Sequence, residues 1–436
     1  MNRLQQKLSE AHPMVFSLFA IIAAFCTYSC MYAFRKPYTA AAFADEAPVW
    51  GMTYKSLLVI TQVLGYMLSK FVGIKVISEM KSGARALWIL ALIGLAELSL
   101  LGFGLVSAPY NMIFLFLNGL PLGMIWGLVF SYLEGRKFTE IMGLGLCSSF
   151  IFASGITKDV GKALMQGGVS EFWMPAATGL VFAIPAVFFI WMLNQLPPPT
   201  EEDVALRTVR TPMNGQERVA FFKRFSVGLI LLVTVYTMLT AYRSFRDDFL
   251  ADIWIDLRGA DAASVDFSAT EVPISIGVLL LLMLLVLVKD NIKALMINHF
   301  AILAGVLLAG ISTWAFQRGL ISDYLWLLMT GFGTYMAYIP FNAILFDRMI
   351  AAFRYASNVG FLIYLADSFG YLGNIAVLVY KDFGGKELSW AEFFTQISYA
   401  LALIGLVGMI LSAIYFLRKH RLLITETKEP KTPSLS

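Results

Sequence analysis

The chain has 436 residues, of which 58% are hydrophobic and only 14% are charged, against roughly 25% charged residues in an ordinary soluble domain. This composition excludes a water-soluble globular core. The net charge of +4 would indicate a nucleic-acid partner only if the basic residues gathered on one exposed surface. They are spread over short segments between apolar runs, so we expect no nucleic-acid partner and a chain surrounded by lipid bilayer.

Apolar segments of about 20 residues, the length that crosses the hydrocarbon layer, recur about twelve times along the chain. The first six predicted cores are Phe16–Phe34, Leu57–Ile77, Ala86–Val106, Met112–Tyr132, Ile141–Gly155 and Met174–Leu196. The next six are Phe225–Tyr242, Val272–Val288, Ala294–Trp314, Tyr324–Phe346, Val359–Val379 and Ile397–Phe416. The pattern predicts an all-α integral membrane protein with twelve transmembrane helices.

The loops predict the orientation of these spans. If the N-terminus is cytoplasmic, the inner loops and the tail hold most of the lysines and arginines, among them Arg136, Arg210 and Arg348. This is the asymmetry of the positive-inside rule. We therefore expect a multi-pass protein of the cell (inner) membrane with both termini in the cytoplasm.

The longest polar interruption on the inner side runs from about Pro197 to Arg224 and opens with three prolines. A boundary there leaves six spans on each side. The predicted domains are an N-terminal six-helix bundle (1–196), a cytoplasmic linker (197–224), a C-terminal six-helix bundle (225–418) and a cytoplasmic tail (419–436).

Two weak internal similarities support a duplicated half. The pattern Tyr-x4-Ala-aromatic-Arg occurs at 28–35 and again at 236–243, an offset of 208 residues. Gly119, Met124 and Arg136 recur, 212 residues later, as Gly331, Met336 and Arg348. Two similar offsets near half the chain length are typical of transporters built from repeats.

Three cations lie within a predicted span or directly at its end, at membrane depth, where a charge costs at least a few kcal/mol unless it faces a cavity or a partner. They are Arg35, Lys70 and Arg243. Each shares a predicted helix face with hydroxyl-bearing side chains. These are Tyr28 and Tyr32 beside Arg35, Tyr66 beside Lys70, and Tyr236 and Thr240 beside Arg243. Converging cations of this kind predict a site for an anion, because guanidinium groups match carboxylate or phosphate oxygens.

Structural alternatives stand beside this interpretation. Arg35 precedes Lys36-Pro37 and could reach the outer headgroups. Arg243 has Asp247 four residues later and could be a paired residue at a helix end. The repeat and the shared faces favour the functional interpretation for both.

Two acidic residues, Glu97 and Asp367, also lie within predicted spans. Each could carry a proton or could neutralise one of the cations in the empty state. Met124 and Trp126, by contrast, are predicted to serve helix packing.

Other chemistry is not indicated. The three cysteines lie in apolar segments, and the three histidines are scattered without a second ligand at metal spacing. There is no nucleotide-binding Gly-x4-Gly-Lys-[Ser/Thr] loop and no set of nucleophile, base and oxyanion donor at usable spacing. We expect no metal, no cofactor and no catalytic site.

The motifs around the cations resemble the major facilitator superfamily, and within it the organophosphate:phosphate antiporters. The first helix of those transporters carries Tyr-x3-Tyr-x2-Arg-Lys, which Tyr28, Tyr32, Arg35 and Lys36 match. Further matches are the Tyr66-x2-Ser69-Lys70-Phe71 pattern, Arg243 with Asp248, and Phe369-Gly370-Tyr371-x-Gly373. The chain lacks the fifth-helix histidine of that branch, where Lys158 is the nearest strong donor, so it looks like a divergent bacterial member.

The resemblance implies two six-helix bundles that rock about a central site, in which Arg35 and Arg243 hold a phosphoryl group. The predicted substrate-binding residues are Arg35, Arg243, Lys70, Tyr28, Tyr32, Tyr66, Tyr236 and Tyr371, with Glu97 and Asp367 as candidates for coupling. The predicted function is that of a monomeric secondary transporter of a small organic anion, with phosphate esters among the candidates. A non-transporting membrane sensor for such an anion, and a proton-coupled symporter of another solute, are the alternatives.

Overall fold

The computed structural model describes residues 3–79, 82–134, 136, 138–198, 215–353, 359–384 and 387–428, and these are almost entirely helical. Helices of 19 residues or more in the first half are α2 (Pro13–Tyr32), α3 (Tyr54–Glu79), α4 (Arg85–Leu105), α5 (Met112–Phe130), α6 (Thr139–Gln166) and α7 (Met174–Leu193). In the second half they are α9 (Gly215–Asp248), α11 (Ser268–Val286), α12 (Asn291–Gln317), α13 (Asp323–Ala343), α15 (Val359–Phe383) and α16 (Trp390–Lys428). The shorter elements are α1 (Arg3–Ser9), α10 (Leu250–Arg258), α14 (Leu345–Ala352), η1 (Pro37–Ala40), η2 (Ser82–Ala84) and η3 (Gly259–Ser264).

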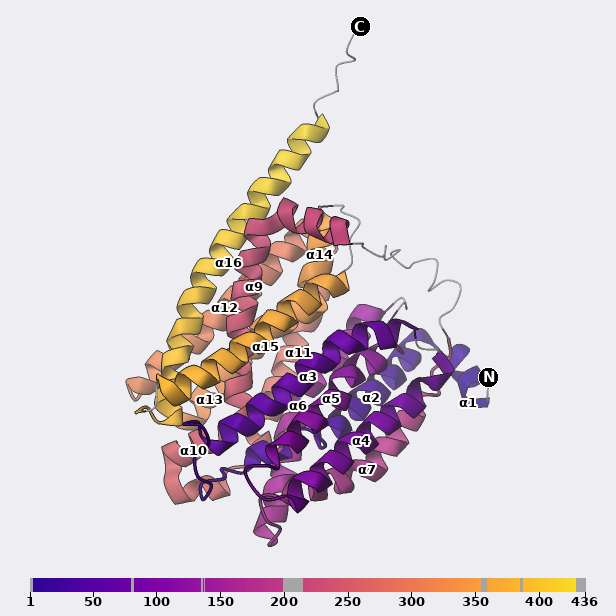
Figure 1. The fold of residues 1–436 in the computed structure, drawn as a ribbon. Coiled ribbons are helices and arrows are strands. Elements are labelled where there is room, and N and C mark those ends of the chain that lie inside the picture. Colours follow the sequence, from indigo (N-terminus) through magenta and orange to yellow (C-terminus); the bar gives the residue numbers. More distant parts are fainter. Residues whose placement is uncertain are drawn as a thin grey trace.

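The long helices form two six-helix bundles with the same packing plan (Figure 1). In the first bundle α2 packs on α6 and α7, while α5 packs on α3 and α4. In the second, α9 packs on α15 and α16, while α13 packs on α11 and α12. The repeated pattern is the pseudo-symmetry that the two sequence offsets predict. The predicted fold class is therefore confirmed.

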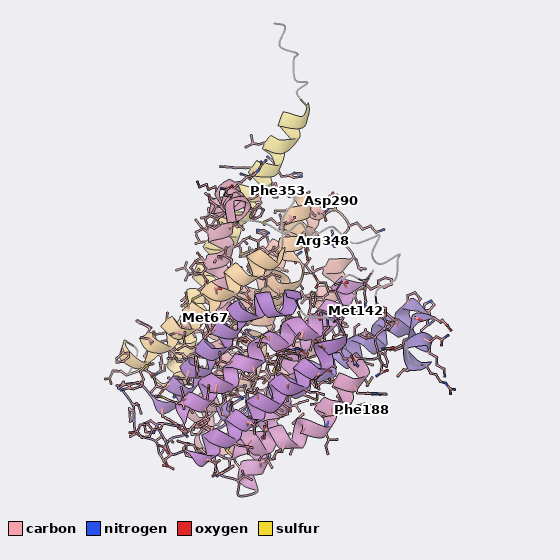
Figure 2. The ribbon with its side chains drawn as sticks, turned by 45° about the vertical axis from the view of Figure 1, so that its right-hand side comes forward. Met67, Met142, Phe188, Asp290, Arg348 and Phe353 are labelled. Carbon is pink, nitrogen blue, oxygen red and sulfur yellow. The ribbon has the colours of Figure 1, made fainter. Side chains whose placement is uncertain are left out.

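The outer faces of both bundles are apolar. Nine of the described helices are long and apolar enough to cross a membrane. Large apolar side chains are exposed on them, such as Ile184 at 82% and Leu98 at 66%, and Figure 2 shows Phe188 at the outer edge of the first bundle. Such continuous apolar surface would drive aggregation in water, whereas lipid covers it at no cost, so the chain is a multi-pass membrane protein.

Small residues bring α5 against the backbone of α3. A Cβ atom at Gly119 would lie 2.3 Å from the carbonyl oxygen of Gln62, and one at Gly123 would lie 2.6 Å from that of Tyr66. Close backbone approach at glycine is common between helices in membranes. The contact fixes the part of α3 that carries Tyr66 and Lys70.

The two bundles meet along α3 with α15 and along α6 with α11. Among the described residues, the polar contacts that join the bundles lie at the level of Lys70 and Asp367 or toward the 33–53 and 249–267 loops, as with Lys55 and Asp252. The structure is therefore closed on the side of these loops.

Some helix ends differ from the predicted ones. α2 ends at Tyr32, so Arg35 lies in the following turn, where its N–H donates to the carbonyl oxygen of Tyr32 at 3.0 Å. α6 continues to Gln166, well beyond the predicted Gly155, because Lys158 and Lys162 of its polar end have partners on the second bundle, the buried Asp247 and the carbonyl oxygen of Val265. Most of the predicted linker, 199–214, and the tail from 429 lie outside the described residues.

Candidate functional site

A pocket lies between the two bundles, near the middle of the long helices. It encloses about 40 Å³ of space accessible to the centre of a water molecule. The first bundle lines it with Tyr28, Tyr32, Arg35, Tyr66, Lys70, Trp126 and Phe150, and the second with Arg243, Tyr338, Asn342, Ile363, Asp367 and Tyr371. Both halves of the chain thus contribute cations and hydroxyl groups to one cavity.

Arg35 and Arg243 face this pocket from opposite bundles. No carboxylate of the described residues lies within ion-pair distance of either guanidinium group. Each is held instead over an aromatic ring: Arg35 lies 4.0 Å from the ring centre of Tyr66, and Arg243 lies 4.5 Å from that of Tyr338. Cation–π contacts at this distance orient a guanidinium group without neutralising its charge. The two arginines are therefore available to an anion.

Lys70, the third cation, has a partner. Its ammonium group lies 2.5 Å from Oδ2 of Asp367 on the other bundle. The second carboxylate oxygen of Asp367 accepts a hydrogen bond of 2.5 Å from the Tyr236 hydroxyl, whose oxygen lies 3.1 Å from the hydroxyl of Tyr338 and can accept from it. This chain of contacts ties α3 to α9, α13 and α15 at the wall of the pocket.

Seven of the eight predicted binding residues line the pocket, and Tyr236 lies directly behind Asp367. The two acidic candidates are separated. Asp367 is in the pocket wall, whereas Glu97 is not among the lining residues and lies beside α7, where a Cβ atom at Gly179 would come within 2.1 Å of its Oε2. Neither carboxylate oxygen of Glu97 has a hydrogen-bond partner among the described residues.

Some pocket residues escape the sequence analysis, namely Trp126, Phe150, Tyr338, Asn342 and Ile363. Trp126 is predicted to serve packing; it does stack on Phe130 at 5.0 Å, but it also lines the pocket, and its indole N–H has no acceptor among the described residues. Trp126 and Tyr338 are 212 residues apart, the offset of the second internal repeat. That offset, applied to every aromatic residue of the fourth span, would have indicated both.

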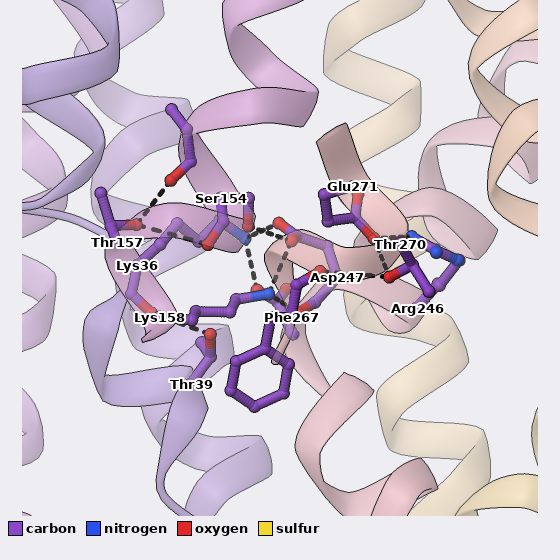
Figure 3. A network of polar contacts seen from close by, with 12 residues as sticks. Lys36, Thr39, Ser154, Thr157, Lys158, Arg246, Asp247, Phe267, Thr270 and Glu271 are labelled. Atoms are coloured by element: carbon purple, nitrogen blue, oxygen red, sulfur yellow. Dashed lines mark hydrogen bonds and ion pairs between the residues drawn. The ribbon is translucent and has the colours of Figure 1, made fainter. Parts of the chain in front are cut away.

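A second charged group, which we call the loop-side cluster, comprises Lys36, Ser154, Lys158, Asp247 and Asp248 (Figure 3). Asp247 of the second bundle lies 2.6 Å from the ammonium group of Lys36 and 2.7 Å from that of Lys158. It also accepts from the hydroxyl of Ser154, and Lys36 further contacts Asp248. Two lysines and two aspartates make the cluster neutral, and every ion pair in it joins one bundle to the other.

The loop-side cluster corrects two of the sequence interpretations. Asp247 pairs with Lys36 and Lys158 rather than with Arg243, so the helix-end pairing of Arg243 is wrong. Lys158, considered as the nearest strong donor to the anion, is fully committed to Asp247 outside the pocket lining.

The pocket itself corrects a third interpretation. Arg35 does not extend to the headgroups, because it is 9% exposed and lines the pocket.

Comparison with solved structures agrees with this architecture. The peptide transporter POT in complex with sulfate superposes with a TM-score of 0.61 at 14% identity, over 96% of this chain and 99% of that one. The D-xylose-proton symporter gives a TM-score of 0.58 at 14% identity over 92% and 97%, and the nucleoside transporter NupG gives 0.59 at 15% over 90% and 98%. The chain therefore has the major facilitator fold.

The sequence itself places the chain in one family. Residues 37–419 match the profile of the family described as "Family of unknown function (DUF5690)", so the chain belongs to that family. No curated protein matches the sequence significantly.

Proposed function

We propose that this protein is a secondary transporter of a small organic anion that works by alternating access. One observation carries the proposal: Arg35 and Arg243 face a single cavity from opposite bundles, and no carboxylate in the described part of the chain pairs with either. Buried cations without counter-ions are costly. A ligand that supplies the missing negative charge is the simplest way to offset that cost, and it would draw the two bundles together.

The charge of the pocket favours a dianion. Its lining holds three cations and one carboxylate, Asp367, so that the net charge is +2 when all are ionised. A phosphate monoester or inorganic phosphate carries up to two negative charges and offers several oxygens to paired guanidinium groups. The hydroxyls of Tyr28, Tyr32 and Tyr66 and the free indole N–H of Trp126 would add neutral donors. The resemblance to organophosphate:phosphate antiporters supports the same substrate class.

The size of the cavity favours a moving transporter over a rigid receptor. About 40 Å³ accommodates only a few water molecules, so a phosphate ester requires the bundles to separate. Proteins of the same fold in the comparison are named as transporters of peptides, xylose and nucleosides. Opening of the loop-side cluster would expose the pocket to the side on which the structure is now closed.

Coupling and membrane placement extend the proposal. We assign Asp367 as the first candidate for coupling, either to protons or to phosphate exchange, because a substrate anion would compete with it for Lys70. Glu97 is the second, because its carboxylate is buried and without a hydrogen bond in the described part. We further propose that the protein is a monomer in the cell inner membrane and that both its termini lie in the cytoplasm. The two bundles would comprise residues 1–196 and 225–418.

The test is uptake into proteoliposomes of labelled phosphate esters, inorganic phosphate and carboxylates. The wild type is compared with Arg35→Ala, Arg243→Ala and, as a matched control, Arg258→Ala, an arginine that binds Asp323 outside the spans. Loss of a charge contact to a buried ligand costs about 2–5 kcal/mol, so each pocket variant should lose about 100-fold or more of its uptake. The control should retain it.

Two results would contradict the proposal. Anion uptake that survives both pocket substitutions would exclude the arginine pair as the binding site and favour a neutral or cationic solute. A protein that binds a phosphate ester in calorimetry but transports no solute in the panel would support the sensor.

A further inference from the structure

A long apolar groove runs along α9 on the outside of the second bundle. α9 forms its floor, α15 one wall and α16 part of the other, and Figure 1 shows α9 between α15 and α16. The floor includes Phe222, Ile230, Thr234 and Ala241. At 1.5 Å per residue, the 222–241 segment extends about 28 Å, close to the roughly 30 Å thickness of a hydrocarbon core.

This groove is separate from the pocket between the bundles. Its volume is about 700 Å³, and its surface is almost wholly apolar. Ile230 at 54% and Phe369 at 49% are exposed in it. The glycine of α15 at position 373 permits the deep contact, because a Cβ atom there would lie 2.6 Å from Cγ2 of Thr237. A space of this size and polarity on a membrane-facing surface fits a hydrocarbon chain.

One end of the groove is basic. Lys223 and Arg224 directly follow Phe222 at the beginning of α9, and both are exposed. On α16, Lys419 reaches across to donate to the carbonyl oxygen of Arg224 at 2.6 Å, beside exposed Arg418. Basic residues at the end of an apolar groove, three of them exposed and Lys419 half-buried, match the anionic headgroup of a phospholipid whose acyl chain lies in the groove.

We propose that the groove between α9, α15 and α16 binds an anionic phospholipid, with an acyl chain along Ile230 and Thr234 and a headgroup phosphate at Lys223 and Lys419. The long side chains of these two lysines can reach the headgroup level while their stems stay on apolar surface. The headgroup end of the site lies near the beginning of α9. Its occupant requires no solute in the central pocket, so the proposal is independent of the transport function.

The experiment counts bound lipids by native mass spectrometry. The protein is purified and equilibrated with equal amounts of phosphatidylglycerol and phosphatidylcholine that carry the same acyl chains. Two variants address the site: Lys223→Gln/Lys419→Gln removes charge, and Thr234→Trp fills the groove. The matched control, Lys289→Gln/Lys293→Gln, removes two lysines of the segment that starts α12, near Asp290, at the same end of the bundle as Phe353 (Figure 2).

The wild type should retain phosphatidylglycerol about tenfold over phosphatidylcholine, since each basic residue near an anionic lipid contributes about 1 kcal/mol. Lys223→Gln/Lys419→Gln should abolish the preference, Thr234→Trp should reduce retention of both lipids, and the control should behave as the wild type. A wild type without preference would overturn the proposal. So would an equal loss in the control, which would indicate general surface charge, or a Thr234→Trp variant that retains its lipid.

Discussion

Arg35 and Lys36 are neighbours in the chain, yet their surroundings differ completely. Arg35 faces the central pocket and has no carboxylate partner among the residues that the structure describes, whereas Lys36 is bound to Asp247 and Asp248 in the loop-side cluster. On α9 the same contrast separates Arg243, which faces the pocket, from Asp247, which contacts two lysines. One region has a net positive charge and the other is neutral.

The difference indicates that the two adjacent sites have different roles, the loop-side cluster in holding the bundles together and the pocket in binding a ligand. Ion pairs that join the bundles hold them together on one side, because each partner would be left buried and unpaired if the other moved away. Arg35 and Arg243 have no carboxylate partner among the described residues, and in the proposed function the bound anion supplies the negative charge. The following changes test whether the loop-side cluster closes the bundles and the pocket binds the anion.

The largest effect is expected for Asp247→Asn. The change leaves Lys158 without its carboxylate partner, and breaking a buried pair costs about 3–5 kcal/mol. Opening of the bundles relieves this cost, so the closed form should lose about 100-fold in relative population. Spin labels at Tyr110 and Leu320, exposed loop positions on the two bundles, should then lie farther apart by double electron–electron resonance.

The control for this experiment is Asp266→Asn, since the Asp266 side chain is 72% exposed and lies 4.0 Å from Lys162. An exposed pair contributes at most about 1 kcal/mol, so the label distances should not change. If Asp247→Asn leaves them unchanged too, the loop-side cluster does not close the bundles.

The pair of Lys70 and Asp367 tests the charge of the pocket. Lys70→Gln lowers the net charge from +2 to +1 and should weaken phosphate binding about tenfold, whereas Asp367→Asn raises it to +3. The double variant restores +2. In calorimetry it should bind phosphate within about threefold of the wild type, because the loss from Lys70→Gln and the gain from Asp367→Asn offset each other. A double variant that binds as weakly as Lys70→Gln would refute this account.

Tyr338 supports Arg243 through its ring rather than its hydroxyl. Tyr338→Phe keeps the ring 4.5 Å from the guanidinium group and should change the affinity for anion less than about threefold. Tyr338→Leu removes a cation–π contact of about 1–2 kcal/mol and should reduce it about tenfold. Equal losses in the two variants would point instead to the hydrogen bond with Tyr236.

The smallest effect is expected at the pair of Arg258 and Asp323. The guanidinium group donates hydrogen bonds of 2.6 and 2.8 Å, which lower the pKa of Asp323 below its ordinary value. A lowered carboxyl pKa stabilises the fold above the ordinary aspartate pKa, and this contribution is lost as the pH falls through the lowered one. Because the pair is partly exposed, Arg258→Ala should cost less than about 1 kcal/mol. Thermal unfolding should therefore show a larger difference between the variant and the wild type at pH 7 than at pH 3.

Much of the fold could be predicted because the signal is local. Apolar segments of membrane-spanning length and two repeat offsets indicate the helices and the bundle plan. The ends of helices were harder, since α6 extends past its apolar core to residues whose partners lie on the other bundle. The role of Trp126 could not be predicted for the same reason. An indole in an apolar helix either packs against its neighbours or donates a hydrogen bond, and the neighbours that decide this come from other helices.

The sequence by itself determined the twelve-helix architecture, the candidate cations and most of the residues that line the pocket. These follow from the free-energy cost of placing polar groups in hydrocarbon, because that cost depends on the residues of each segment by itself. Only the tertiary structure decided which charges are paired. Asp247 is four residues from Arg243 in the chain, but the lysines of the opposite bundle take it, because an ion pair depends on distances across the interface. The packing of the bundles thus places the two arginines around one cavity, where no carboxylate of the described ranges pairs with them.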